Sequence, residues 1–531
     1  MNVKYFALGL LACAGMVSCS NNDDITEGGQ KGDGSIETAY LAVNINNVGG
    51  PESRVDGGFE DGSDAENAIK KVRFYFFNSD GSACAVDGGN NYKDVENPTM
   101  SSEGTTDNVE EISDAILVLP GITGQAPYSM VTVVNPPSEL TGNLSLSQLK
   151  STVADYLTNN ATSGTFVMSN SVYADGTNVV CETPVSAYLR NSQSAAEANP
   201  VSVYVERVLA KVYVTFSGAE KADNQYLVSG TDGSDDAIYA KVIGWGIVGT
   251  INKSNLLKSI DPTGWATSLS GFSWNDVLNH RSYWATTPIG SGVTVDNNFK
   301  YTELANADGA SVYTQELTPT QTVTDVVANS ISKVVVAVQL VNKDGNPVPR
   351  YEYLGSTFAS AEAILTAIAP NFSKYWVKLD DTHYSQLRPE DLEFKSGASM
   401  GEAATYNAYP QIKLGVTLYT QSGEDYTPVE DLSEVNKALK AYYARIWTDG
   451  KCYYTTTIEH LGESGVPKYG VVRNHIYRVN VSDITGFGTP VYNPETDEVT
   501  PIIPSGEETY LAAQVNVLAW KVVNSDVTLG Q

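Results

Sequence analysis

The segment Tyr40-Leu-Ala-Val-Asn-Ile45 alternates between apolar residues and small or polar ones, so Leu41, Val43 and Ile45 fall on one face of an extended chain. Successive side chains of a strand point to opposite sides of the sheet, and this period of two therefore predicts a strand with one buried face. The next apolar run, Lys71-Val-Arg-Phe-Tyr-Phe-Phe77, predicts a second strand that stops at a turn signal rich in Asn, Asp and Gly. Both segments predict a β-sheet.

The overall composition favours a large, mainly β protein. Of the 531 residues, 42% are hydrophobic and 18% are charged, which is enough apolar material for two or more packed domains. The 31 Tyr and 13 Phe, together with many Val and Thr, suit half-buried pleated surfaces better than helix interiors. A formal net charge of −29 would repel a phosphate backbone or an anionic lipid surface, which argues against nucleic acid as a partner.

Further along the chain, apolar spacing predicts more strands and only a few short helices. The expected strands cover residues 115–119, 128–134, 201–205, 208–216, 333–341 and 411–419. In the last of these, the residues expected on one buried face are Ile412, Leu414, Val416 and Leu418. Helical spacing after a Ser or Asp cap predicts helices that cover the sheets over residues 145–157, 356–368 and 431–443.

The first residues have the pattern of an export signal. Lys4 opens a short basic region, and the apolar run Tyr5–Val17 leads to small residues around Cys19. This run of 13 residues is too short to span a bilayer, so residues 1–19 are expected to be a signal peptide. The pattern is similar to a bacterial lipobox, in which Cys19 becomes the lipidated first residue of the exported form. An ordinary signal peptide with an incidental Cys is the alternative.

A long connection without an apolar face follows the first predicted strand. It begins near Gly49 and continues through the acidic, glycine-rich segment Val55–Asp64. Arg54 stands alone in this connection, which makes it an accessible target for a trypsin-like protease. Before the strand, residues 20–35 are rich in Asn, Asp and Gly, as expected of a tether.

Three short motifs contain residue types found in catalytic or binding sites, but their surroundings favour structural roles. Gly397-Ala-Ser399-Met-Gly401 matches a nucleophile elbow, yet it lacks the flanking buried strand and helix. Gly244-Trp-Gly-Ile-Val-Gly249 matches a dinucleotide fingerprint, but a glycine-permitted bend in a strand explains it better. Asp380-Asp-Thr-His383 could begin a metal site, but the sequence does not identify the other ligands, so an acidic turn explains it better. We therefore expect no catalytic, cofactor-binding or metal site.

The cysteines support the same expectation. Cys84, Cys181 and Cys452 lie in no redox or nucleophile motif, so each is expected to be a buried small hydrophobic residue. The acidic loops at residues 56–64 and 232–236 have several carboxylates that could bind Ca²⁺, but neither has the spacing of an EF-hand.

Several segments along the chain form a recognisable series. They are the lipobox around Cys19, Asn67–Asn78, Val205–Val212, Ile243–Trp245 with Thr250–Lys253, Arg473–Val479 with Gly486, and Val515–Trp520. Taken together and in this order, they resemble the fimbrilin family, the subunits of type V pili in Bacteroidia, and in particular the major subunit of the short (minor) fimbriae. The loops between them show no recognisable match.

The resemblance implies two transthyretin-like antiparallel β-sandwich domains with a few short covering helices. It also implies cleavage by an Arg-specific protease, which we map to the bond between Arg54 and Val55 because Arg54 follows the first strand. Arg73 lies inside a predicted strand and should resist. The expected divisions are a signal peptide at 1–19, a tether and first strand removed as a propeptide at 20–54, an N-terminal sandwich at 55–198, a C-terminal sandwich with insertions at 199–508, and a donor-strand tail at 509–531.

Removal of the first strand would leave a groove that another strand can refill. Loss of Leu41, Val43 and Ile45 exposes unpaired backbone groups and bare core side chains. The tail offers a replacement with alternating apolar residues, which are Leu511, Ala513, Val515, Val517, Ala519, Val523, Val527 and Leu529. Insertion of a neighbour's tail would bury roughly 300 to 500 Å² of apolar surface, worth on the order of 8 to 12 kcal/mol before ordering costs. Such a head-to-tail contact does not close on itself and builds a filament.

These expectations favour a structural rather than an enzymatic function. The chain would be the main stalk subunit of a cell-surface fimbria, exported as a lipoprotein to the outer membrane and supporting adhesion and biofilm formation. Its partners would be further copies of itself, anchor and tip fimbrial subunits, the maturation protease and an unidentified surface receptor, with no cofactor and membrane contact only through the precursor lipid. The alternatives are an accessory or tip adhesin, a monomeric glycan-binding lipoprotein with exposed Trp and Tyr platforms, and an exported hydrolase that depends on Ser399.

Overall fold

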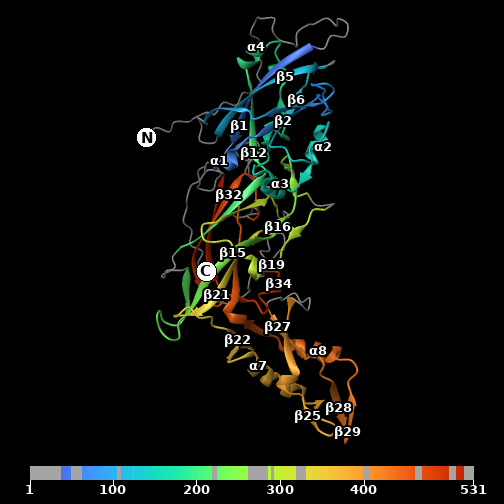
Figure 1. Ribbon diagram of the computed structural model, residues 1–531, viewed down its shortest axis with the longest axis vertical. Coiled ribbons are helices and arrows are strands. Elements are labelled where there is room, and N and C mark those ends of the chain that lie inside the picture. The colour runs from blue at the N-terminus through green and yellow to red at the C-terminus, as the bar shows by residue number, and fades with distance from the viewer. Residues whose placement is uncertain are drawn as a thin grey trace.

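The computed structural model is an elongated molecule built mainly of β-strands, with a few short helices (Figure 1). It describes residues 37–48, 62–103, 109–122, 125–175, 178–217, 224–260, 285–288, 292–318, 331–398, 407–460, 469–501 and 510–519. The mainly β fold expected from the composition is confirmed. None of the helices within these ranges is long and apolar enough to cross a membrane.

One sheet of nine strands forms the upper part of the molecule in Figure 1. Its order is β3-β2-β6-β8-β12-β1-β5-β4, with β11 paired to β6. The strands are β1 (Glu37–Val48), β2 (Lys71–Phe77), β3 (Tyr92–Glu96), β4 (Thr99–Glu103), β5 (Val109–Ile122), β6 (Ser129–Val134), β8 (Met168–Asn170), β11 (Thr183–Pro184) and β12 (Val201–Arg207). Val72 of β2 and Leu117 of β5, from distant parts of the sheet, belong to one buried core, so the sheet rolls around its own interior.

Short elements surround this sheet and join it to the rest of the molecule. Strands β9 (Tyr173–Asp175) and β10 (Asn178–Val180) form a hairpin, and β7 (Val153–Ala154) pairs with β17 (Ser254–Asn255) of the following part of the chain. The helices are α1 (Asp64–Asn67), α2 (Leu146–Lys150), α3 (Tyr156–Ser163), α4 (Gln193–Glu197) and the 3-10 helix η1 (Ser186–Tyr188).

Two facing sheets form the middle of the molecule. One has the order β20-β13-β32-β35 and the other β14-β15-β21-β31-β33, and apolar side chains of both fill a shared core. Their strands are β13 (Leu209–Phe216), β14 (Gln225–Ser229), β15 (Ile238–Val248), β20 (Ser311–Gln315), β21 (Lys333–Asn342), β31 (Lys451–Thr457), β32 (His475–Thr485), β33 (Thr489–Pro490) and β35 (Tyr510–Ala519). Beside them lie the pairs β16 (Thr250–Ile251) with β18 (Val295–Asp296) and β19 (Phe299–Lys300) with β34 (Glu498–Val499), and the 3-10 helix η2 (Tyr301–Glu303).

A distal lobe continues the long axis at the bottom of Figure 1. It contains one sheet of order β23-β22-β30-β27-β26 and another of order β25-β24-β28-β29, around a core of their own. The strands are β22 (Arg350–Tyr353), β23 (Ser356–Phe358), β24 (Tyr375–Lys378), β25 (Tyr384–Gln386), β26 (Leu392–Ser396), β27 (Asn407–Ile412), β28 (Leu418–Ser422), β29 (Asp425–Pro428) and β30 (Ala444–Trp447). The helices of this part are α7 (Ala361–Ile368), α8 (Ser433–Leu439), η3 (Ala369–Phe372), η4 (Pro389–Asp391), η6 (Lys440–Tyr442) and η7 (Thr448–Gly450).

Three expectations about local structure are wrong. The helix expected over 356–368 starts only at Ala361, because residues 356–358 form β23, which pairs with β22. The strand expected over 411–419 is interrupted, because β27 ends at Ile412 and β28 starts at Leu418 in a different sheet. Between them, Leu414 is 95% exposed and Gly415 adopts a φ of 88°, a conformation that glycine permits and that turns the chain. The helix expected over 145–157 is likewise two short helices, α2 and α3, separated by β7.

The glycine-rich segment that resembles a dinucleotide fingerprint is instead part of β15. The register between β15 and β21 shifts between Val242 and Gly244, so the strand bulges at this point. A Cβ atom on Gly244 would lie 2.3 Å from the carbonyl oxygen of Leu304. Gly244 is therefore required by the close approach of a second backbone, as the strand-bend interpretation expects.

Substitution Gly244→Ala should lower the free energy of unfolding by about 1 to 3 kcal/mol, because the Leu304 backbone must move to make room. Chemical denaturation followed by circular dichroism measures the change. Gly246→Ala in the same strand is the matched control, since its Cβ would meet only the end of the Leu304 side chain, at 2.8 Å, and should cost less. Equal losses for the two variants would contradict the backbone-contact explanation.

Candidate assembly site around the first strand

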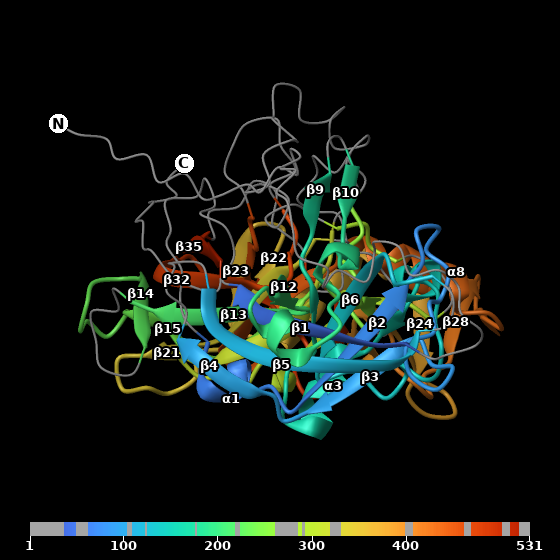
Figure 2. The same cartoon turned by 90° about the horizontal axis from the view of Figure 1, so that it is seen from above.

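Strand β1 lies in the interior of its sheet and is held along both edges by strands far away in sequence (Figure 2). On one side it pairs antiparallel with β5 along nearly its whole length. On the other side it pairs in parallel with β12, starting with Val43 opposite Val201. Closer to its start, the Tyr40 amide donates to the Arg190 carbonyl at 2.8 Å, and the Arg190 amide donates back at 3.0 Å. Removal of β1 would thus leave unpaired backbone groups on both sides.

The side chains of β1 that face the interior are fully enclosed. Leu41 and Val43 are 0% exposed and Ala39 is 2% exposed. They belong to the same core as residues of β2, β5, β6, β8 and β12, so they are surrounded by the rolled sheet. The side chain of Ile45 lies outside the described part of the structure. Loss of β1 would leave an apolar groove between β5 and β12. The backbone N–H and C=O groups along both edges of this groove would need hydrogen bonds from water or from another strand.

Substitution Leu41→Ala should destabilise the uncleaved protein by about 2 to 5 kcal/mol, because it opens a cavity in a closed core. The melting temperature of the precursor measures this loss. Val118→Ala is a suitable control, since Val118 lies on β5 opposite Tyr40 but is 39% exposed, and it should have little effect. A precursor that tolerates both substitutions equally would show that β1 is not a core strand.

The chain after the predicted cleavage loop is tied to the middle pair of sheets. Helix α1 begins with a capping box in which the Ser63 amide donates to the Glu66 carboxylate at 2.7 Å. The same carboxylate accepts from the Tyr313 hydroxyl at 2.5 Å and from Lys211 at 2.9 Å. Buried Arg207 donates to the Glu66 carbonyl at 3.0 Å. These four hydrogen bonds would stay in place after β1 leaves, because none of them involves β1.

The electrostatics of this anchor keep Glu66 ionised. Burial raises the pKa of the Glu66 carboxyl, but the hydrogen bonds from Tyr313, the Ser63 amide and Lys211 outweigh burial and hold the pKa below its usual value. The charged hydrogen bonds link the start of the first sheet to β13 and β20. The sequence did not predict this anchor. The one local signal for it is the spacing of Ser63 and Glu66, which is that of a capping box.

The C-terminal strand β35 lies at the edge of its sheet and pairs antiparallel with β32. The register runs from Tyr510 opposite Thr485 to Ala519 opposite His475. The backbone of the first five predicted donor residues is therefore in this strand, and these residues are Leu511, Ala513, Val515, Val517 and Ala519. The remaining site residues, Cys19, Arg54, Val55, Val523, Val527 and Leu529, lie outside the described residues.

Two family models match the sequence. Residues 39–207 match the model of the major fimbrial subunit protein (FimA), and residues 445–526 match the model of the C-terminal part of fimbrillin, the major fimbrial subunit protein type IV. The sequence is therefore similar to fimbrial subunits over these two segments. The first match runs from within β1 to the end of β12, so it contains most of β1 and both strands that flank it. The second match contains β32 and β35. Both models describe major subunits of fimbriae.

Several solved structures have a remote likeness to this protein. A fimbrilin from Porphyromonas gingivalis is 15% identical, with a TM-score of 0.36, and the match covers 91% of this chain and 99% of that one. The tip fimbrial protein Mfa3 of the same organism is 12% identical, with a TM-score of 0.31 and coverage of 91% and 100%. A protein assigned to cell adhesion from Parabacteroides distasonis is 12% identical, with a TM-score of 0.39 and coverage of 92% and 98%. No curated protein matches the sequence.

Two of the three motifs of catalytic type have structural surroundings. His383 and Asp380 contact each other at 2.8 Å in an exposed turn, and Gly244 lies in a strand bulge. Ser399 lies outside the described residues. Among the residues that the structure describes, no group of three or more His, Cys, Asp or Glu side chains could hold a metal ion.

The three cysteines of the described ranges are buried free thiols. Burial raises the pKa of Cys84 and Cys452, and it raises the pKa of Cys181 to about 12. Because the thiolate is the reactive form, thiols with raised pKa values are poor nucleophiles at neutral pH. Cys84, Cys181 and Cys452 therefore have packing roles here.

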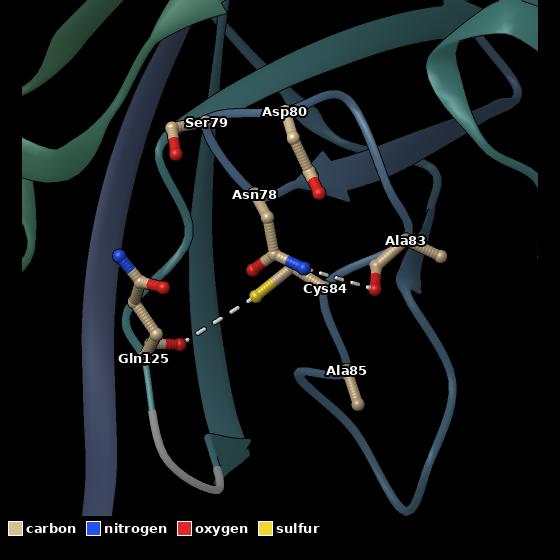
Figure 3. A pocket seen from close by; sticks show the side chains of 7 residues that line it. All are labelled: Asn78, Ser79, Asp80, Ala83, Cys84, Ala85 and Gln125. Atoms are coloured by element: carbon tan, nitrogen blue, oxygen red, sulfur yellow. Dashed lines mark hydrogen bonds between the residues drawn. The ribbon is translucent and has the colours of Figure 1, made fainter.

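An open pocket of about 400 Å³ lies beside the turn after β2 (Figure 3). Its lining includes Asn78, Asp80, Cys84 and Gln125, and Gln125 follows shortly after the end of β5. The Cys84 thiol donates to the Gln125 carbonyl at 3.7 Å, and the Asn78 amide donates to the Ala83 carbonyl at 3.4 Å. The bond from Cys84 to Gln125 joins the two connecting segments, and the bond from Asn78 to Ala83 lies within the turn after β2. The pocket is therefore a hollow between loops.

Two buried histidines lie where β32 begins, opposite the end of β35. His475 is 1% exposed, and its ring centroid is 5.0 Å from that of His460. The His475 Nδ1 donates to the Arg473 carbonyl at 2.7 Å. Burial, followed by the proximity of His460, lowers the pKa of His475 well below its usual value, so the ring is neutral at pH 7.

This arrangement predicts acid sensitivity. The pKa of an unfolded His is about 6.5. Below that pH the unfolded chain binds a proton at this residue, whereas folded His475 stays neutral. The free energy of unfolding therefore falls by up to about 1.4 kcal/mol per pH unit as the pH decreases. Stability is unaffected by this group above that pH. Urea denaturation at pH 7.5, 6.5 and 5.5 measures the slope, which should be smaller in His475→Gln. His383→Gln, at an exposed site, is the matched control, and an unchanged slope in His475→Gln would contradict the assignment.

Proposed function

We propose that this protein is a fimbrilin, the polymerising stalk subunit of a cell-surface fimbria, and that it assembles by donor-strand exchange. In this mechanism, cleavage after Arg54 releases β1, and a strand from the tail of a neighbouring subunit enters the groove between β5 and β12. The interior position of β1 carries the proposal, since removal of a strand that is paired on both sides and buried in the core leaves two unpaired edges and an exposed core. The resulting filament would support adhesion and biofilm formation.

Export as a lipoprotein is part of the same proposal. Lipidation at Cys19 would hold the precursor at the outer membrane, and the segment from residue 20 to β1 would serve as its tether. Because the predicted cut lies after β1, one cleavage by an Arg-specific protease would remove the lipid, the tether and the strand together. Anchor and tip subunits would be the partners at the two ends of the filament.

The pairing of β35 with β32 favours the last part of the tail as the inserted strand. Detachment of β35 would expose one edge of β32 along its whole length, which is costly. Residues 520–531 follow the paired residues of β35 in the chain, and if extended they would reach about 40 Å. This segment has 12 residues, as does β1, and its apolar positions Val523, Val527 and Leu529 would replace side chains of β1.

The proposal predicts that brief digestion with an Arg-specific protease converts a soluble precursor starting at Ser20 into filaments. N-terminal sequencing should give Val55, unboiled gels should show a ladder, and electron microscopy should show fibres. Arg54→Ala should abolish all three results, whereas Glu52→Ala in the same loop is the control and should change none. A product that starts at Val55 but remains monomeric would contradict the stalk role and favour a tip or accessory subunit.

Two truncations distinguish the parts of the tail. A chain that ends at Ala519 should still be cleaved but should form no ladder, because it lacks the inserted strand. A chain that ends at Glu508 also loses β35 and serves for comparison. If the chain ending at Ala519 polymerises and the chain ending at Glu508 does not, then β35 rather than residues 520–531 is the donor.

A further inference from the structure

The four-stranded sheet of the distal lobe has one face that packs on the core and one that does not. Val377 of β24 and Leu418 of β28 are buried in the core of the lobe. Trp376 precedes Val377 and Tyr419 follows Leu418, and the two aromatic residues lie opposite each other in the strand register. Because successive side chains of a strand alternate, Trp376 and Tyr419 point away from the core. Trp376 and Tyr419 are partly exposed. The outer face therefore holds large aromatic residues that the core does not use.

Four aromatic rings gather on this outer face. The rings of Tyr384 and Tyr426, which come from the two edge strands β25 and β29, stack with centroids 3.9 Å apart and planes 2° apart. Trp376 meets Tyr426 edge to face at 5.4 Å, and Tyr419 meets Tyr384 in the same way at 5.1 Å. All four residues are partly exposed. We call these four residues the aromatic face.

The aromatic face has amide groups beside it and little net charge. Gln386 and Gln421 are exposed and project to the same side as Trp376 and Tyr426, according to the strand register. Lys378 is the one charged residue of these four strands on that side, and its ammonium lies 3.7 Å from the Asp381 carboxylate. In a chain with a net charge of −29, this is a nearly neutral surface that suits an uncharged ligand.

We propose that the aromatic face binds a neutral carbohydrate chain. The C–H groups of a pyranose ring pack on aromatic rings, and amide side chains both donate to and accept from its hydroxyl groups. A charged glycan or nucleic acid would gain nothing from a neutral face and would be repelled by the acidic protein around it. The exposed aromatic cluster is larger than the scattered apolar residues of an ordinary surface, and it has the polar surroundings of a binding surface.

The position of the aromatic face is compatible with a filament subunit. It lies at the end of the long axis opposite the sheet that contains β1 (Figure 1). It also lies in residues 208–444, between the segments that the two family models match. Binding at this face is thus separate from strand exchange, and each copy in a filament would present one such face.

Glycan binding can be tested on the uncleaved precursor starting at Ser20, so the result does not depend on assembly. Isothermal titration with cellohexaose, mannohexaose and chitohexaose should show binding to at least one of them. Trp376→Ala and Tyr426→Ala should weaken that binding about tenfold or more, as expected for loss of a stacking ring. Tyr443→Ala is the matched control, because Tyr443 is 51% exposed in the same lobe and belongs to none of the three ring contacts of the aromatic face.

A second variant covers the case in which loss of a ring disturbs the sheet. Gln421→Ala leaves the four rings intact and should still weaken binding, while the melting temperature stays that of the parent protein. Three results would overturn the proposal: no heat with any of the three oligosaccharides up to about 5 mM, unchanged affinity in both ring variants, or binding only to an oligogalacturonate or to a proline-rich peptide offered in parallel.

Discussion

The pairing of β1 with β5 on one side and β12 on the other is the constraint on which the first sheet depends. These three strands come from residues 37–48, 109–122 and 201–207, so their contacts bring together the start, the middle and the end of the first 207 residues. The buried Leu41 and Val43 connect this backbone pairing to the core. Loss of a strand in this position leaves unpaired backbone groups and an open core that an equivalent strand would fill, and the proposed assembly follows from that requirement.

The anchor around Glu66 complements this arrangement. It fixes the chain after the proposed cleavage site to β13 and β20 through Lys211 and Tyr313. The protein can therefore lose one strand of the first sheet while the link to the middle sheets persists. At the other end, β35 lies at a sheet edge next to β32.

The sequence predicted the strands with clear alternation, because a period of two depends only on neighbouring residues. It therefore identified Leu41 and Val43 as buried before the structure was known, and it recognised Gly244 as a strand position. It could not show that β1 and β12 pair in parallel, since register between distant strands leaves no local pattern. The interruption near Leu414 was missed because Ile412 and Leu418 are both buried, but in different sheets. The aromatic face was missed for a similar reason: Trp376, Tyr384, Tyr419 and Tyr426 come together only in the folded lobe.

Hydrogen exchange of the amides of β5 and β12 tests the central claim most directly. We expect these amides to be protected in the precursor, to exchange much faster after cleavage in a chain that ends at Ala519, and to regain protection in filaments of the full-length cleaved chain. Amides of β21, which lies in the middle sheets, should remain protected throughout. If cleavage leaves the protection of β5 and β12 unchanged, then β1 has not left its place, and strand exchange at this groove is wrong.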